Sequence, residues 1–173
     1  MFERTLVLLK PECIERKLIG KIIERIENAN LNIQQIKILT TNKKIISEHY
    51  PEDQAWLKLL GEKTRAAPGG DEKWKDWTDI KIGYNIRNKL INSLVDKPVV
   101  AMVVSGEFAI QNVRKLIGAT EPRVALAGTI RGDFSTDSYD LADKENRSIE
   151  NLIHASDSQE TAEREIKLYF NSK

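Results

Sequence analysis

The sequence predicts an α+β protein of the ferredoxin-like kind, a sandwich in which helices cover a mainly antiparallel, four-stranded sheet. The first observation is the order of the apolar patterns, which contains two strand-helix-strand units and ends on a helix. The second is that neither Gly-x-x-x-x-Gly-Lys-Ser/Thr nor Gly-x-Gly-x-x-Gly occurs, so a doubly wound nucleotide-binding fold fits less well. Any bound phosphate must then be held by side chains.

Apolar runs and helical spacing define the first elements. Residues 5–9 form a largely apolar run that predicts a strand, and this strand ends at Lys10 because a proline follows. Isoleucines at helical spacing predict an amphipathic helix at about 18–29. A polar helix is expected at about 43–50, before another proline. Between these helices, three residues alternate with polar neighbours and predict a half-buried second strand: Ile36, Ile38 and Thr40.

The composition changes at about 51–79, which holds all three tryptophans but few aliphatic residues. This segment is interpreted as an inserted hairpin of short helices and loop, because it cannot build a core of its own. An apolar stripe at about 82–94 predicts the next helix. Residues 99–104 are apolar without interruption, which indicates a strand at the centre of the sheet.

The last third of the chain completes the pattern. A helix at about 107–117 ends at a glycine, and residues 129–134 are interpreted as a shaped loop. A second polar insertion follows at about 135–148, and residues 152–154 form a short strand. Four residues mark the inner face of a final helix: Ala162, Ile166, Tyr169 and Phe170.

Length and composition restrict the class of protein. A chain of 173 residues favours one domain, residues 1–173, with the insertions inside it. A net charge of +1 argues against a broad surface for nucleic acid. No segment approaches the roughly 20 apolar residues of a membrane span, and no signal peptide is apparent. Because Cys13 is the single cysteine, no intrachain disulfide can form, and a reducing compartment, the cytoplasm, is expected.

The segment 151–158 places one of only two histidines, His154, just before a strong helix start. Ser156 and Asp157 are each followed three residues later by Gln or Glu, so each could form a capping box. A helix N-terminus beside an imidazole suits an anion. A lone histidine at a strand end is nevertheless more often a packing or surface residue, so this segment by itself leaves packing and catalysis both open.

Five blocks of sequence are specific enough to indicate a family. They are Glu3-Arg4-Thr5-Leu6 with Lys10-Pro11, Val99-Val100-Ala101-Met102, Arg114-Lys115-Leu116-Ile117-Gly118 with Thr120 and Pro122, Gly128-Thr129-Ile130-Arg131-Gly132-Asp133-Phe134, and Asn151-Leu152-Ile153-His154-Ala155-Ser156-Asp157-Ser158. With these blocks in this order, the chain resembles the nucleoside diphosphate kinase family from Glu3 to Phe170. The two insertions resemble those of a longer, archaeal-type form of that family.

The resemblance implies transfer of the γ-phosphate of a nucleoside triphosphate, such as ATP, to a nucleoside diphosphate through a phosphohistidine on His154. A neutral imidazole is nucleophilic near pH 7, which agrees with such ping-pong turnover. The resemblance also makes Glu165 the residue that orients the ring, with Ser156 supporting it, and counts Lys10 among the catalytic residues. Six residues are implied in nucleotide binding: Lys10, Tyr50, Arg114, Thr120, Arg131 and Asn151. Lys10, Arg114 and Arg131 are the cations that phosphoryl transfer requires.

The resemblance further implies Mg²⁺ that arrives with the nucleotide, without direct protein ligands, and Asp157 is the candidate for a contact through water. It implies a homohexamer, or alternatively a tetramer, with nucleotides as substrates. The composition predicts neither a membrane nor a nucleic acid as a partner. The chain departs from the family where Lys-Pro-Asp-Gly reads Lys10-Pro11-Glu12-Cys13. The residues that stack on the base fall near Leu60 and Ile149 and stay unassigned.

Two other classes of function stay open. An RNA-binding module can use the same fold, but the central strands 5–9 and 99–104 lack the aromatic residues on which bases stack. A catalytically silent, regulatory member of the family is disfavoured because His154 and the cationic residues are all retained.

Overall fold

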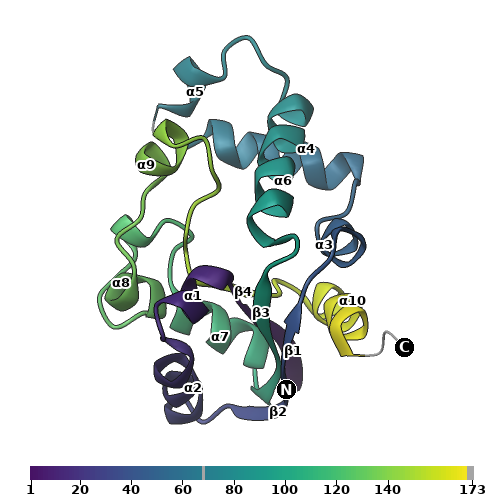
Figure 1. The fold of residues 1–173 in the computed structure, drawn as a ribbon, viewed down its shortest axis with the longest axis vertical. Coiled ribbons are helices and arrows are strands. Elements are labelled where there is room, and N and C mark those ends of the chain that lie inside the picture. Colours follow the sequence, from purple (N-terminus) through teal and green to yellow (C-terminus); the bar gives the residue numbers. More distant parts are fainter. Residues whose placement is uncertain (68, 171–173) are drawn as a thin grey trace.

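A computed structural model describes residues 1–67 and 69–170, so Pro68, within the first predicted insertion, lies outside the described residues. Within the described chain, four strands form one sheet in the order β2-β3-β1-β4, and all neighbouring strands are antiparallel (Figure 1). The strands are β1 (Phe2–Leu9), β2 (Asn32–Thr40), β3 (Pro98–Glu107) and β4 (Ile153–Ala155). The predicted ferredoxin-like α+β fold is confirmed, and so is the central position of the strand at 99–104.

The two central strands are apolar on both faces because helices cover both sides of the sheet. On one side, Val7 and Leu9 pack against α2 (Ile19–Asn28) and α7 (Ala109–Ile117). On the other side, Leu6 and Leu8 pack with residues of three helices, which are α3 (Lys43–His49), α6 (Asp79–Leu94) and α10 (Gln159–Phe170). Figure 1 shows α2 and α7 on one side of the strands and α3 and α10 on the other.

The predicted second strand exists, but the prediction of its buried face was wrong. The side chains of Ile36 and Ile38 are 49% and 68% exposed. They stand opposite Met102 and Val100 in the ladder, yet β2 is the edge strand, where the helical cover ends. The alternating pattern identified the strand correctly and could not tell that its apolar face would be left open.

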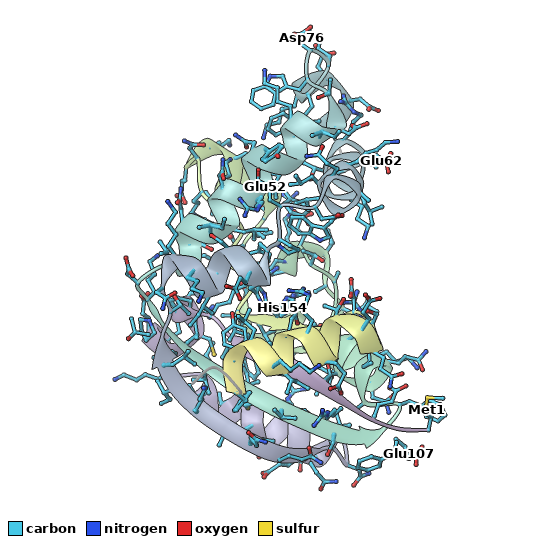
Figure 2. The ribbon with its side chains drawn as sticks, turned by 90° about the vertical axis from the view of Figure 1, so that its right-hand side faces the viewer. Met1, Glu52, Glu62, Asp76, Glu107 and His154 are labelled. Atoms are coloured by element: carbon cyan, nitrogen blue, oxygen red, sulfur yellow. The ribbon has the colours of Figure 1, made fainter. Side chains whose placement is uncertain are left out.

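The segment 51–79 contains α4 (Gln54–Arg65) and α5 (Gly70–Lys73), and α9 (Tyr139–Lys144) lies within 135–148. The helix α4 packs closely on α6 because glycines stand at the contact: a Cβ at Gly61 would lie 1.8 Å from the Asp79 carbonyl oxygen. A Cβ at Gly83 would lie 2.0 Å from the carbonyl oxygen of Leu57. The helices α4, α5 and α6 together form an arm of the molecule. Figure 2 shows Glu62 and Asp76 on this arm, at the end of the molecule opposite Met1 and Glu107.

Several short elements differ from the predictions. Residues 129–134 form a helical turn, α8 (Ile130–Phe134), because the Thr129 hydroxyl accepts a hydrogen bond from the Gly132 N–H, at 3.2 Å. The short helices α1 (Pro11–Glu15) and η1 (Pro122–Val124) were not predicted. Ser158, rather than Ser156 or Asp157, caps α10 by accepting from the Thr161 N–H at 3.1 Å. None of the helices among the described residues has the length and apolar character needed to span a membrane.

Candidate active site

The register of β4 decides which way His154 points. His154 stands directly opposite Leu8 on β1, so both side chains lie on the same face of the sheet. Its neighbours Ile153 and Ala155 belong to the core on the other face. His154 therefore faces α3 and α10 while its side chain stays 23% exposed. Figure 2 shows it between the sheet and the helical arm.

One carboxylate oxygen, Oε2 of Glu165 on α10, contacts both His154 and Ser156. His154 Nε2 lies 3.0 Å from this oxygen, and the Ser156 hydroxyl donates to it at 2.6 Å. Burial opposes ionisation of Glu165, but attraction to His154 and these hydrogen bonds lower its pKa overall. An ionised carboxylate accepts hydrogen bonds, so Nε2 carries the ring proton and Nδ1 keeps a free lone pair.

The second histidine, His49, lies beside His154 and was not recognised from the sequence. The ring centroids of the two are 4.5 Å apart, edge to face. His49 is only 2% exposed, and neither ring nitrogen has a hydrogen-bond partner among the described residues. Burial first, and then the neighbouring His154, lower the pKa of His49 to about 3, so its ring is neutral. The available signal was its position at the end of a helix directly before Tyr50, a predicted site residue.

Lys10 and Asn151 form a buried pair at the floor of the site. Lys10 Nζ donates to Asn151 Oδ1 at 2.6 Å, and Asn151 Nδ2 donates to the Thr120 carbonyl oxygen at 2.9 Å. Burial is the main cause that lowers the pKa of Lys10, to about 8. The amide and the ammonium group therefore hold each other in place, and Thr120 lines the same cleft.

The residue between Asn151 and β4 has an unusual backbone. Leu152 adopts a φ of 69°, a conformation that a bulky residue keeps only when its surroundings enforce it. The Leu152 N–H donates to Glu12 Oε1 at 3.0 Å, and its carbonyl oxygen accepts from the Lys10 N–H at 2.9 Å. Glu12, one of the departures from the family pattern, thus joins the turn after β1 to the histidine segment.

The two arginines differ in how they are held. Arg131 is buried and donates to three backbone carbonyls, those of Asn151, Gly118 and Ile153, at 3.1, 3.0 and 2.7 Å. Its burial lowers its pKa to about 10, so it stays charged near pH 7. Within the part of the chain that the structure describes, three of its five donors are engaged, which leaves two for a ligand. Arg114 is exposed, and its guanidinium makes no hydrogen bond with another described residue.

These groups surround one cleft of about 450 Å³, a size suited to a small-molecule ligand. The arm contributes Trp56, Leu60 and Lys63 to its lining, and Trp56 stacks on Tyr50 with ring centroids 6.3 Å apart. Ile149 lines a different cavity. Nine of the predicted site residues line this cleft: Lys10, Tyr50, Arg114, Thr120, Arg131, Asn151, His154, Asp157 and Glu165. The tenth, Ser156, does not line it and contacts Glu165 instead.

The cleft can perform nucleophilic chemistry on an anion. It combines an imidazole, whose nitrogen away from Glu165 can attack, with cations from three separate parts of the chain. Such an arrangement matches phosphoryl transfer, in which the protein mainly positions the groups and stabilises negative charge.

Comparisons with known proteins agree with this chemistry. The model of the family "Nucleoside diphosphate kinase" matches residues 3–58 and 75–173. A nucleoside diphosphate kinase of Pyrobaculum aerophilum is 42% identical over 99% of this chain and 96% of its own length. That of Methanocaldococcus jannaschii is 39% identical over 98% of this chain and 94% of its own length.

Solved structures give the same result. The crystal structure of an NDP kinase from Pyrobaculum aerophilum has a TM-score of 0.89 at 40% identity and covers 98% of this chain and 96% of its own. A nucleoside-diphosphate kinase from Borrelia burgdorferi, solved as a transition-state mimic with bound vanadate and ADP, has a TM-score of 0.77 at 32% identity. The match covers 98% of this chain and 87% of the Borrelia chain. Sequence, fold and site geometry lead to one conclusion: this chain belongs to the nucleoside diphosphate kinase family.

Proposed function

We propose that Nδ1 of His154 is the nucleophile that carries a phosphoryl group from a nucleoside triphosphate, such as ATP, to a nucleoside diphosphate. The observation that carries the proposal is the contact of His154 Nε2 with Glu165, because it leaves Nδ1 with its lone pair. When Nδ1 attacks the γ-phosphorus, the bond from that phosphorus to the bridging oxygen breaks and the diphosphate leaves. The ring, now substituted on both nitrogens, is cationic, and the Glu165 carboxylate neutralises it. A second diphosphate then reverses the step.

The remaining groups bind and orient the nucleotide. Arg114 and the two free donors of Arg131 can hold phosphate oxygens in pairs, and the Thr120 hydroxyl adds one more donor. The paired Lys10 and Asn151 offer an ammonium group and an amide for the sugar hydroxyls. Support also comes from the Borrelia burgdorferi relative, which was solved with ADP and vanadate.

The cleft suits a magnesium ion that comes with its nucleotide. Asp157 and Glu165 are the two carboxylates of the cleft lining among the described residues, and Glu165 already accepts bonds from His154 and Ser156. Mg²⁺ prefers six oxygen ligands and retains several waters, so Asp157 would contact it through water. When bound, the ion neutralises the charge of the phosphate oxygens.

The predicted organisation of the chain belongs to the same proposal. The match to the family model leaves out residues 59–74, which lie inside the proposed insertion 51–79 of a single domain. The match to the family model continues without a gap through residues 135–148, so the proposal of a second insertion there is supported by the sequence pattern alone. We place the protein in the cytoplasm as a homohexamer, with a tetramer as the alternative; the exposed Ile36 and Ile38 of edge strand β2 support an assembly.

Intact-protein mass spectrometry after incubation with ATP and Mg²⁺ tests the mechanism, at neutral to basic pH because phosphohistidine is labile in acid. We expect a single phosphoryl adduct that GDP removes and that His154→Ala does not form. The matched control is His49→Gln, which alters the neighbouring imidazole and should still form the adduct. An adduct that persists in His154→Ala would overturn the assignment. Nucleotide binding without any adduct would favour the regulatory class instead.

A further inference from the structure

Three side chains in the site form a cluster of potential metal ligands, and one of them, His49, has no part in the proposed phosphoryl transfer. His49, His154 and Glu165 each offer one atom for a metal, and these atoms all lie within 4.8 Å of one another. The pair from His154 Nε2 to Glu165 Oε2 measures 3.0 Å, and the pair from His49 Nδ1 to Glu165 Oε1 measures 3.7 Å. Tetrahedral zinc with bonds of about 2.0–2.1 Å separates its ligands by about 3.3 Å. The two measured distances, which end on the two different oxygens of the Glu165 carboxylate, lie on either side of this value.

His49 supplies an independent observation. It is buried, its two ring nitrogens have no hydrogen-bond partner among the described residues, and its ring packs between Tyr50, His154 and Tyr169. A buried polar group without a hydrogen-bond partner destabilises the folded state, so its retention calls for a reason. The proposed transfer reaction does not use it. A metal ion would give one of these nitrogens its missing partner.

The donor set indicates which ions fit. Two neutral imidazoles and one carboxylate suit Zn²⁺, Co²⁺ or Ni²⁺, whereas Mg²⁺ prefers oxygen ligands alone. His154 is partly open to the cleft, so a water molecule can complete a fourth position. The distance of 3.7 Å from His49 Nδ1 to Glu165 Oε1 exceeds the tetrahedral spacing, so His49 and Glu165 must move slightly closer for the ion to bind.

We propose that His49, His154 and Glu165 bind a divalent transition-metal ion such as Zn²⁺, and that this binding prevents phosphorylation of His154. The ion would take the lone pair of His154 Nε2 in place of the hydrogen bond to Glu165. The ring proton then moves to Nδ1, which loses the lone pair needed for attack. Metal binding stands on the geometry alone, whereas the inhibition rests on the proposed function of His154.

Titration of the purified, tag-free protein with Co²⁺, followed by visible absorption without nucleotide, tests the binding. We expect one Co²⁺ per chain with the intense absorption of a four- or five-coordinate ion. His49→Gln should weaken binding by at least about tenfold, because loss of even an outer partner of a metal site costs roughly 10–100-fold. Cys13→Ser, which removes the one thiol, should bind as the wild type does. A spectrum of the six-coordinate aqueous ion, or equal binding by His49→Gln, would overturn the proposal.

A second measurement needs no substitution at His49. Wild-type protein that ATP has phosphorylated, freed of nucleotide and Mg²⁺, should no longer give the Co²⁺ spectrum, because its Nε2 keeps a proton. Conversely, Zn²⁺ added first should suppress the phosphoryl adduct in the wild type more than in His49→Gln, each relative to its own metal-free rate. Equal suppression would mean that Zn²⁺ acts on the nucleotide and would refute the inhibition. If no adduct forms at all, the proposed function fails, while the Co²⁺ titration still decides the metal site.

Discussion

Glu165 acts on His154 through a single oxygen, and its charge is the property that matters at the residue scale. We predict that Glu165→Gln lowers the rate of phosphohistidine formation by about 10²-fold, the usual cost of removing one electrostatic partner of a transition state. The amide keeps the shape but cannot neutralise the cationic ring. Rapid-quench measurement of the phosphoryl adduct gives the rate. Glu163→Gln, on the same helix but paired with Arg4 at the surface, is the control and should react like the wild type.

Ser156 shares the oxygen of Glu165 that His154 contacts, and its effect should be smaller. We expect Ser156→Ala to slow adduct formation by about tenfold, the equivalent of one hydrogen bond to a charged group. The measurement is the same rapid-quench assay. A loss as large as that of Glu165→Gln would show that the hydroxyl does more than support the carboxylate.

The pKa of Lys10 predicts a pH dependence of nucleotide binding. Burial lowers this pKa from its ordinary 10.5 to about 8, so the cation is present below pH 8 and is lost above it. We therefore predict that kcat/KM falls as the pH rises through about 8. Steady-state assays between about pH 6 and 10 would show this. Lys10→Arg keeps its charge throughout the range and should lack the falling limb even if its activity is lower; an unchanged limb would assign it to another group.

At the scale of elements, the close packing of α4 on α6 shapes one wall of the cleft. We predict that Gly83→Ala lowers the free energy of unfolding by about 1–3 kcal/mol, because the new methyl group meets the Leu57 backbone. Since α4 carries Trp56 and Leu60, the KM for nucleotide should rise as well. Thermal unfolding and steady-state kinetics measure the two effects. Gly20→Ala on α2, where nothing lies within 4 Å, should leave both unchanged or raise stability slightly.

At the scale of the whole molecule, the exposed apolar residues of edge strand β2 are the proposed contact surface between copies of the chain. Sedimentation should give six times the mass of one chain, and we predict that Ile38→Lys shifts the protein to smaller species. The lysine would place a charge on an apolar edge that assembly would bury. Gln34→Lys adds the same charge to the strand without removing an apolar side chain. If Ile38→Lys keeps the mass of the wild type, β2 is not an assembly surface.

Much of this molecule could be inferred from local patterns in the chain. The strands β1 and β3 were predictable because uninterrupted apolar runs bury both faces, and only the centre of a covered sheet allows this. The helices α2 and α10 follow from apolar residues at helical spacing. The candidate site residues came from short motifs, whose residue types and order survive in the sequence whatever their distance in space.

Only the tertiary structure decided which of these residues meet and what state they are in. The register of β4 turned His154 toward Glu165. Packing between α3 and α10 buried His49 beside it, where neither of its ring nitrogens has a hydrogen-bond partner among the described residues. The sequence motif shows Arg131 only as a cation, whereas the fold engages three of its N–H donors in hydrogen bonds to backbone carbonyls. The physical reason is that propensity and periodicity depend on neighbours along the chain, whereas burial, pKa and contact depend on groups that the fold brings together from distant positions.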